Sequence, residues 1–222
     1  MNVKPRTVLF DLDGTLIDSI PMIVASFRHT LVTHLGSSVS DEVLIQGIGT
    51  PLRAQLARYC DDPAVVDAMF HTYKSHNVAV HDALLKPFPE VNVAVAALHA
   101  GGARLGVVTS KSREVALRGL ALCGLAPYFP VVIALEDSAR HKPDPEPVRV
   151  GLERVGAVAY DAVYIGDSTH DLWAGRAAGT RTGGVAWGPF PRADLLACEP
   201  DWFFERASDM VEAFLPGERG DG

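Results

Sequence analysis

The sequence has few cysteines, no long apolar run and no excess of positive charge. Its 222 residues include three cysteines, Cys60, Cys123 and Cys198, an odd number without Cys-x-x-Cys spacing, so a disulfide framework is not expected. It contains no run of about 18 apolar residues, and its first residues show no long apolar stretch with a cleavage site, so we expect neither a membrane segment nor an export signal. A net charge of −7 gives no basic surface for nucleic acid or an anionic membrane. We therefore expect a cytoplasmic protein whose partner is a small molecule, with no nucleic acid and no membrane involved.

What the sequence does contain is an alternation of short apolar runs and helical patterns over its C-terminal two-thirds. The apolar runs are Val8–Phe10, Leu105–Val108, Val131–Leu135, Val163–Ile165 and Gly184–Trp187, and the helical patterns cover about residues 90–100, 112–123, 145–156 and 169–178. Uninterrupted apolar strands between helices indicate an α/β fold. We predict a Rossmann-like, mostly parallel sheet that is covered by helices on both faces.

Residues 18–85 break this alternation and have helical patterns throughout. Apolar residues repeat every three or four positions from Ile20 to Leu35, which predicts an amphipathic helix. The pairs Thr50-Pro51 and Asp62-Pro63 each place a capping residue before a proline, which predicts two further helix starts. We therefore predict an inserted helical domain at residues 18–85 and a core domain formed by residues 1–17 and 86–222.

Polar side chains follow the apolar runs, at the points where the predicted strands end. They are, in chain order, Asp11, Asp13, Thr109, Ser110, Lys142, Asp167 and Asp171. Ligands of an open parallel sheet bind at the carboxyl ends of its strands, so we expect these side chains to converge. Converging carboxylates repel one another unless a cation neutralises them, and oxygen ligands with room for water suit Mg²⁺. The pattern predicts a magnesium site in which one carboxylate stays ionised as a nucleophile while another, with a raised pKa, donates a proton.

Each of these motifs also has a structural explanation when it is taken alone. Asp13-Gly14 is typical of a tight turn, Thr109 or Ser110 of a helix cap, and Lys142 of a solvated lysine. The combination of Asp-x-Asp, Thr-Ser, Lys and Gly-Asp-x-x-x-Asp on successive strand ends favours catalysis over these separate explanations.

The order of the motifs resembles the haloacid dehalogenase superfamily, in the phosphatase branch that carries a helical cap. The resemblance covers nearly the full length of the chain. It implies that Asp11 attacks phosphorus and that Asp13 protonates the leaving group and then activates water. It further implies that Thr109 and Lys142 bind the phosphoryl oxygens, and we expect Ser110 to contribute to this binding.

The same resemblance implies the metal ligands. Mg²⁺ would be held by Asp11, the backbone carbonyl of Asp13, and Asp167. Asp171 matches a position that contacts the metal directly or through water, or orients Lys142. The dehalogenases of the superfamily lack the second aspartate because halide leaves without a proton, so the presence of Asp13 argues against that reaction.

The helical insertion is expected to close over the site as a lid and to contact the leaving group. Arg53, one turn into the helix predicted after Thr50-Pro51, is the expected contact for an anionic substrate. The stretches "HKPDPEPV", "AGTRTGGVAW" and "PDWFFERASDM" resemble pyrophosphatases of the superfamily, and the general layout equally resembles its phosphoglycolate phosphatases. We predict a Mg²⁺-dependent phosphohydrolase of a small phosphorylated metabolite or of inorganic pyrophosphate, acting through a phosphorylated Asp11.

Two other functions are compatible with the fold. Phosphoglucomutase-type isomerases of the superfamily carry the same two aspartates, threonine or serine, and lysine. A noncatalytic regulator is disfavoured, because Asp11, Asp13, Lys142 and Asp167 are all present. The sequence makes no prediction of the oligomeric state.

Overall fold

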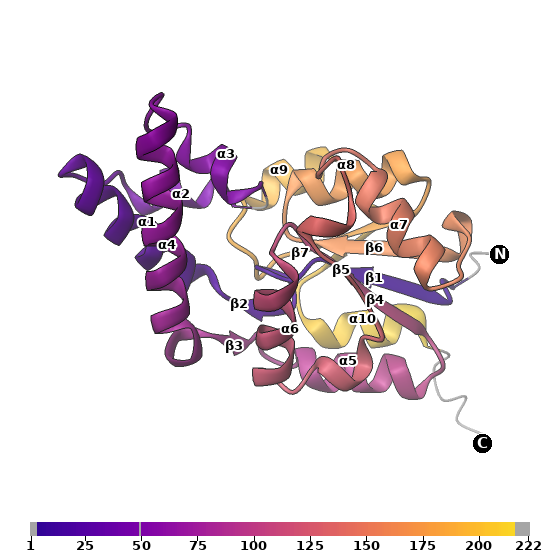
Figure 1. The fold of residues 1–222 in the computed structure, drawn as a ribbon. Helices are drawn as coiled ribbons and strands as arrows, with labels where there is room; N and C mark the ends of the chain where they lie inside the picture. Colours follow the sequence, from indigo (N-terminus) through magenta and orange to yellow (C-terminus); the bar gives the residue numbers. More distant parts are fainter. Residues whose placement is uncertain (1–3, 49, 216–222) are drawn as a thin grey trace, which may run out of the picture.

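A parallel six-stranded sheet forms the centre of the protein (Figure 1). The structure is a computed structural model that describes residues 4–48 and 50–215; the predicted core boundaries at residues 1 and 222 lie outside the described residues. In spatial order the strands are β5 (Val131–Ile133), β4 (Arg104–Val108), β1 (Thr7–Phe10), β6 (Ala162–Gly166), β7 (Arg181–Val185) and β8 (Trp202–Phe204). Every neighbouring pair runs parallel, which confirms the predicted fold class.

Helices cover both faces of this sheet. One face packs against α5 (Val91–Ala100), α6 (Arg113–Leu122) and α10 (Ala207–Phe214), and the other against α7 (Glu146–Arg154) and α8 (Thr169–Ala178). Alternation along β1 explains this division, because Val8 and Phe10 join the first apolar cluster and Leu9 joins the second. A short helix, α9 (Arg192–Ala197), packs through Leu195 against α8.

Four helices form an insertion between the first strand and the rest of the sheet. They are α1 (Ile20–Leu35), α2 (Asp41–Ile45), α3 (Leu52–Leu56) and α4 (Pro63–Leu84), and they lie to one side of the sheet (Figure 1). The chain enters through β2 (Ile17–Asp18) and leaves through β3 (Lys86–Pro87), which pair antiparallel. The division into two domains stays a prediction, and these paired strands lie where it places the boundary.

The local helix signals had mixed outcomes. Asp62 caps α4 as predicted, since its carboxylate accepts a hydrogen bond from the backbone N–H of Ala64 at 2.8 Å. The predicted start at Thr50-Pro51 is wrong by one residue. Pro51 has an extended ψ of 136° and precedes the helix, and the Thr50 hydroxyl donates to the Gly47 carbonyl.

Some sheet elements also differ from the sequence prediction. β5 ends at Ile133 because the chain turns into a short 3₁₀ helix, η2 (Leu135–Asp137). β7 begins three residues earlier than predicted and ends at Val185. β8, α9 and α10 were not predicted.

None of the helices in the described part of the chain has the length and apolar character that crossing a membrane requires.

Candidate active site at the carboxyl ends of the strands

The loops that follow β1, β4 and β6 meet at one edge of the sheet, because these three strands are neighbours and run parallel. Backbone bonds continue the sheet into the loops: the Asp11 N–H donates to the Ile165 carbonyl and the Thr109 N–H to the Ile133 carbonyl, both at 2.8 Å. A cavity of about 160 Å³ opens at this edge. Among the residues predicted to form the site, those that line the cavity are Asp11, Asp13, Thr109, Ser110 and Asp167.

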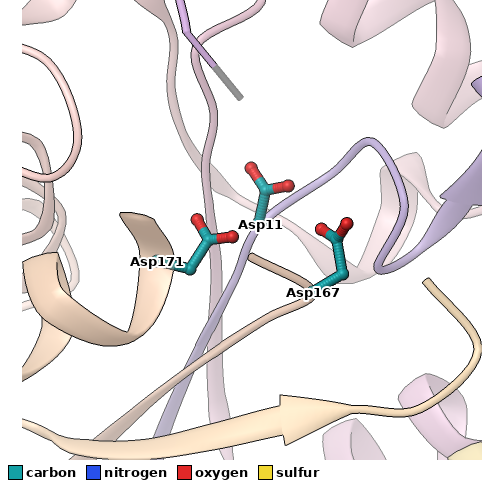
Figure 2. A group of neighbouring side chains, drawn as sticks. All are labelled: Asp11, Asp167 and Asp171. Atoms are coloured by element: carbon teal, nitrogen blue, oxygen red, sulfur yellow. The ribbon is translucent and has the colours of Figure 1, made fainter. Parts of the chain in front are cut away.

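Three buried aspartates form a cluster beside this cavity. Asp11, Asp167 and Asp171 each place one carboxylate oxygen within 4.8 Å of those of the other two. Figure 2 shows the three side chains converging from the loop after β1, the loop after β6 and the start of α8. Burial raises the pKa of Asp11 to about 7, against the opposing effect of Lys142. Burial, followed by the nearby Asp171 and Asp11, raises the pKa of Asp167 well above its usual value.

Lys142 provides the positive charge within this cluster. Its Nζ lies 2.6 Å from Asp11 Oδ1 and 2.6 Å from Asp171 Oδ1, and the side chain is 1% exposed. Burial on its own lowers the pKa of Lys142, but the Asp11 and Asp171 carboxylates raise it well above its usual value. Lys142 is therefore a fixed ammonium group that touches the predicted nucleophile.

Asp171 is engaged on both of its oxygens. Oδ1 accepts from Lys142 and lies 3.1 Å from the Tyr164 hydroxyl, while Oδ2 accepts from the Ser168 N–H and hydroxyl, at 3.1 and 2.5 Å. This arrangement favours the role of Asp171 in orienting Lys142 over direct metal ligation.

Tyr164 was not predicted as a site residue. It lies in an apolar strand, and this sequence context gives no sign that its buried hydroxyl accepts a hydrogen bond from Lys142.

Asp167 differs from Asp171, because one of its carboxylate oxygens has no hydrogen-bond partner. Its Oδ1 accepts from the Thr15 hydroxyl at 3.1 Å, whereas its Oδ2 is buried and has no hydrogen-bond partner. Gly14 permits this close packing: its φ is +86°, and a Cβ there would lie 2.4 Å from Asp167 Oδ2. A buried carboxylate oxygen without a donor is costly, and a cation beside Asp11 and Asp167 would remove that cost.

Asp13 lies next to the three-aspartate cluster and has its own partners. Its Oδ1 accepts from the Ser19 hydroxyl and from Lys111 Nζ, both at 2.5 Å. Among the described residues, the cluster that could hold a metal with side-chain oxygens comprises Asp11, Asp167 and Asp171. The implied metal contact of Asp13 therefore rests on its backbone carbonyl. The sequence analysis assigned no role to Lys111, although it directly follows Thr109-Ser110 at the end of a predicted strand.

The structure does not bring Arg53 to the cavity. Its guanidinium stacks 4.0 Å over the ring of Phe70 and pairs with Asp67 at 2.8 Å, and the side chain is 53% exposed. The expectation that Arg53 contacts an anionic substrate is not supported, because α3 directs the side chain toward α4. The insertion instead contributes mainly apolar and uncharged polar walls, together with the exposed Lys74, and the sequence analysis did not identify these residues. These wall residues include Ile23, Phe27, Ile48, Leu52, Gln55, Phe70, Tyr73 and Asn77.

Comparison with known proteins defines the class of the chain. The family model "Haloacid dehalogenase-like hydrolase" matches residues 8–185. A solved structure of a protein named as a haloacid dehalogenase-like hydrolase, from Bacteroides fragilis, superposes with a TM-score of 0.87 at 28% identity, covering 93% of this chain and 100% of its own. The chain therefore belongs to the haloacid dehalogenase-like hydrolases, as its motifs predicted.

Two further relatives indicate the branch of the family. Pyrophosphatase PpaX of Anoxybacillus flavithermus is 41% identical over 211 residues, which cover 95% of this chain and 96% of that protein. A structure from Lactobacillus plantarum that is named for phosphoglycolate phosphatase has a TM-score of 0.85 at 26% identity, over 96% of this chain and 100% of its own. The predicted resemblance to pyrophosphatases and phosphoglycolate phosphatases is confirmed, and the chain is an enzyme of this phosphatase and pyrophosphatase branch.

Proposed function

We propose that the chain is a Mg²⁺-dependent hydrolase of inorganic pyrophosphate that also accepts small phosphate monoesters and acts through a phosphorylated Asp11. One observation carries this proposal: the Asp11 carboxylate, which lines a small cavity, accepts a hydrogen bond from the Lys142 ammonium and neighbours Asp167, whose Oδ2 has no partner. Identity of 41% to pyrophosphatase PpaX favours pyrophosphate over the other phosphate compounds.

The donor set fits a magnesium ion. Asp11, Asp167 and the backbone carbonyl of Asp13 would hold it, and all three supply oxygen, which Mg²⁺ prefers. Asp167 Oδ2 has no other partner, so a cation there replaces no existing bond. A bound Mg²⁺ supplies neutralisation of the phosphoryl charge.

Asp11 is the proposed nucleophile. A carboxylate oxygen of Asp11 bonds to phosphorus while the bond from phosphorus to the bridging oxygen breaks, and the electron pair leaves with that oxygen. Lys142 stabilises the charge on the phosphoryl oxygens, since Asp171 and Tyr164 hold its ammonium group beside Asp11. Thr109 and Ser110, which line the cavity, complete the phosphoryl contacts.

Asp13 is the proposed acid and base. It gives a proton to the departing oxygen and then takes one from water, whose oxygen bonds to phosphorus as the bond to Asp11 breaks. Ser19 and Lys111 fix the Asp13 carboxylate through Oδ1. The second step restores Asp11 and releases phosphate, which balances the reaction.

The helical insertion is proposed to act as the lid of this site, because residues of α1, α3 and α4 line the cavity.

The thiols of Cys60, Cys123 and Cys198 are unpaired, which supports the inferred cytoplasmic location.

A phosphate-release panel with Mg²⁺ tests the proposal. We expect release from pyrophosphate and from phosphoglycolate, and a loss of about 10⁴-fold or more in Asp11→Asn, because the amide cannot form the phosphoenzyme. Asp61→Asn, at an exposed position, is the matched control. Absence of phosphate release from every substrate, or an Asp11→Asn variant as active as the parent, would overturn the proposal. Conversion of a sugar 1-phosphate to its 6-phosphate without release would instead identify a mutase.

A further inference from the structure

A second lysine lies at the cavity, on the side of Asp13. Lys111 follows β4, and its Nζ is 2.5 Å from Asp13 Oδ1. Its side chain is 13% exposed, although the residue lines the cavity. An ammonium group carries three N–H donors, so the contact with Asp13 leaves donors for a ligand in the cavity.

Negatively charged groups predominate around the cavity, so an anionic substrate needs the positive charge of Lys111 there. Among the described residues, the site holds four carboxylates, those of Asp11, Asp13, Asp167 and Asp171, and the ammonium groups in contact with them are those of Lys142 and Lys111. A divalent cation at Asp11 and Asp167 balances the set, but a pyrophosphate anion adds several negative charges. Lys142 contacts Asp11, the proposed nucleophile, whereas Lys111 contacts Asp13, the proposed acid for the departing group.

The rest of the cavity offers little positive charge. Among the described residues that line it, the cations are Lys74 and Lys111, and Lys74 is exposed to solvent. The wall that α1 and α4 provide includes the apolar side chains of Ile23, Phe27 and Phe70. Attraction between charges is stronger where water is excluded, so Lys111 exerts more influence on a bound anion than the exposed Lys74.

We propose that Lys111 is the specificity-determining residue for the leaving group, which deepens the proposed function and rests on it. Lys111 binds the oxygens of the phosphate that departs, next to the atom that Asp13 protonates. When the bond between phosphorus and the bridging oxygen breaks, the electron pair moves onto that oxygen beside the ammonium group of Lys111. The site therefore prefers phosphoanhydrides, whose leaving group is an anion with several oxygens, over esters with a neutral, apolar leaving group.

Kinetics of Lys111→Met on two substrates test this assignment. Pyrophosphate and p-nitrophenyl phosphate have leaving groups of similar acidity, so they differ mainly in the charge and oxygens that the leaving group presents. We expect the ratio of kcat/KM for pyrophosphate to that for p-nitrophenyl phosphate to fall about tenfold to a hundredfold, the effect of losing a charge-assisted hydrogen bond. Lys111→Arg keeps the charge and should keep most of the preference.

Lys86→Met is the matched control. It removes the same charge from an exposed lysine that pairs with Asp18 at 3.7 Å and lies outside the residues that line the cavity. We expect its ratio to equal that of the parent. If Lys111 only holds Asp13 in place, Lys111→Met will slow both substrates by the same factor, and this result would overturn the assignment.

Binding provides a readout that does not depend on turnover. Calorimetry with imidodiphosphate, a pyrophosphate analogue with a bridging N–H, should show weaker binding to Lys111→Met by about tenfold or more, with inorganic phosphate affected less. Equal changes for the two ligands would contradict the assignment. A parent enzyme that releases phosphate from neither substrate would refute the proposed function itself, whereas an active parent with an unchanged ratio in Lys111→Met would refute only the role of Lys111.

Discussion

The strand ends and the helical insertion contribute to the same cavity in different ways. At the strand ends, buried charged groups contact one another within 2.6 Å, as Lys142 does with Asp11 and Asp171. The insertion contributes mainly apolar side chains, and Arg53, one of its arginines, is exposed and paired with Asp67. The loops that follow the strands therefore hold the groups proposed to react, while the insertion supplies most of the apolar lining of the cavity.

Among the substitutions that compare the two regions, the largest effect should follow from removing the buried cation. Lys142→Met leaves the Asp11 and Asp171 carboxylates buried without a positive partner, so we expect the free energy of unfolding to fall by about 3 kcal/mol. We also expect kcat to fall by about 10³-fold, because the phosphoryl oxygens lose a fixed donor. Urea denaturation and phosphate release measure the two effects.

A second substitution separates charge burial from packing. Adding Asp171→Asn to Lys142→Met removes one of the stranded carboxylates, so the double variant should regain part of the lost stability without regaining activity. A double variant less stable than Lys142→Met would show that the buried charges do not govern this region.

The next effect distinguishes the two aspartates of the last motif. Asp167→Asn weakens a proposed metal ligand, so we expect the Mg²⁺ concentration for half-maximal activity to rise by about tenfold to a hundredfold. Asp171→Asn should lower kcat through a displaced Lys142 while the Mg²⁺ requirement stays close to that of the parent. A Mg²⁺ titration of both variants makes the comparison, and an equal rise in both would assign Asp171 to the metal.

The smallest effect is expected in the insertion. Arg53→Ala removes a half-exposed ion pair with Asp67 and a contact with Phe70, so activity should change by less than about threefold and stability by less than about 1 kcal/mol. A much larger rise in KM for pyrophosphate would restore Arg53 as a substrate contact and remove the contrast between the two regions.

The sequence predicted the sheet well because its strands are short apolar runs buried on both faces. The positions of Asp11, Thr109 and Asp167 at one edge follow from parallel pairing of β4, β1 and β6, since parallel strands bring their carboxyl ends together. The weaker elements were missed for a related reason. β8 at the sheet edge has only three residues, Trp202–Phe204. All three are apolar, but a run this short does not distinguish a strand from other structure.

The helices of the insertion could be predicted from the sequence, but the side chains that they direct toward the cavity could not. The stripe in α1 and the cap of α4 are local signals that neighbouring residues set. Which side chains of α1, α3 and α4 face the cavity depends on how the helices pack against one another and on the core. For that reason Arg53 was assigned to the cavity from its place on a helix, and the cavity contacts of Tyr73 and Gln55 were overlooked.

By itself, the sequence determined the class of enzyme, the parallel sheet and the residue types that carry its chemistry, because motif order and apolar runs are properties of neighbouring residues. The tertiary structure decided the partners: Tyr164 and Asp171 on Lys142, Lys111 on Asp13, and an oxygen of Asp167 left without a donor. These contacts join residues that are mostly far apart in the chain, and their strength depends on burial, which only the folded arrangement of the whole chain sets.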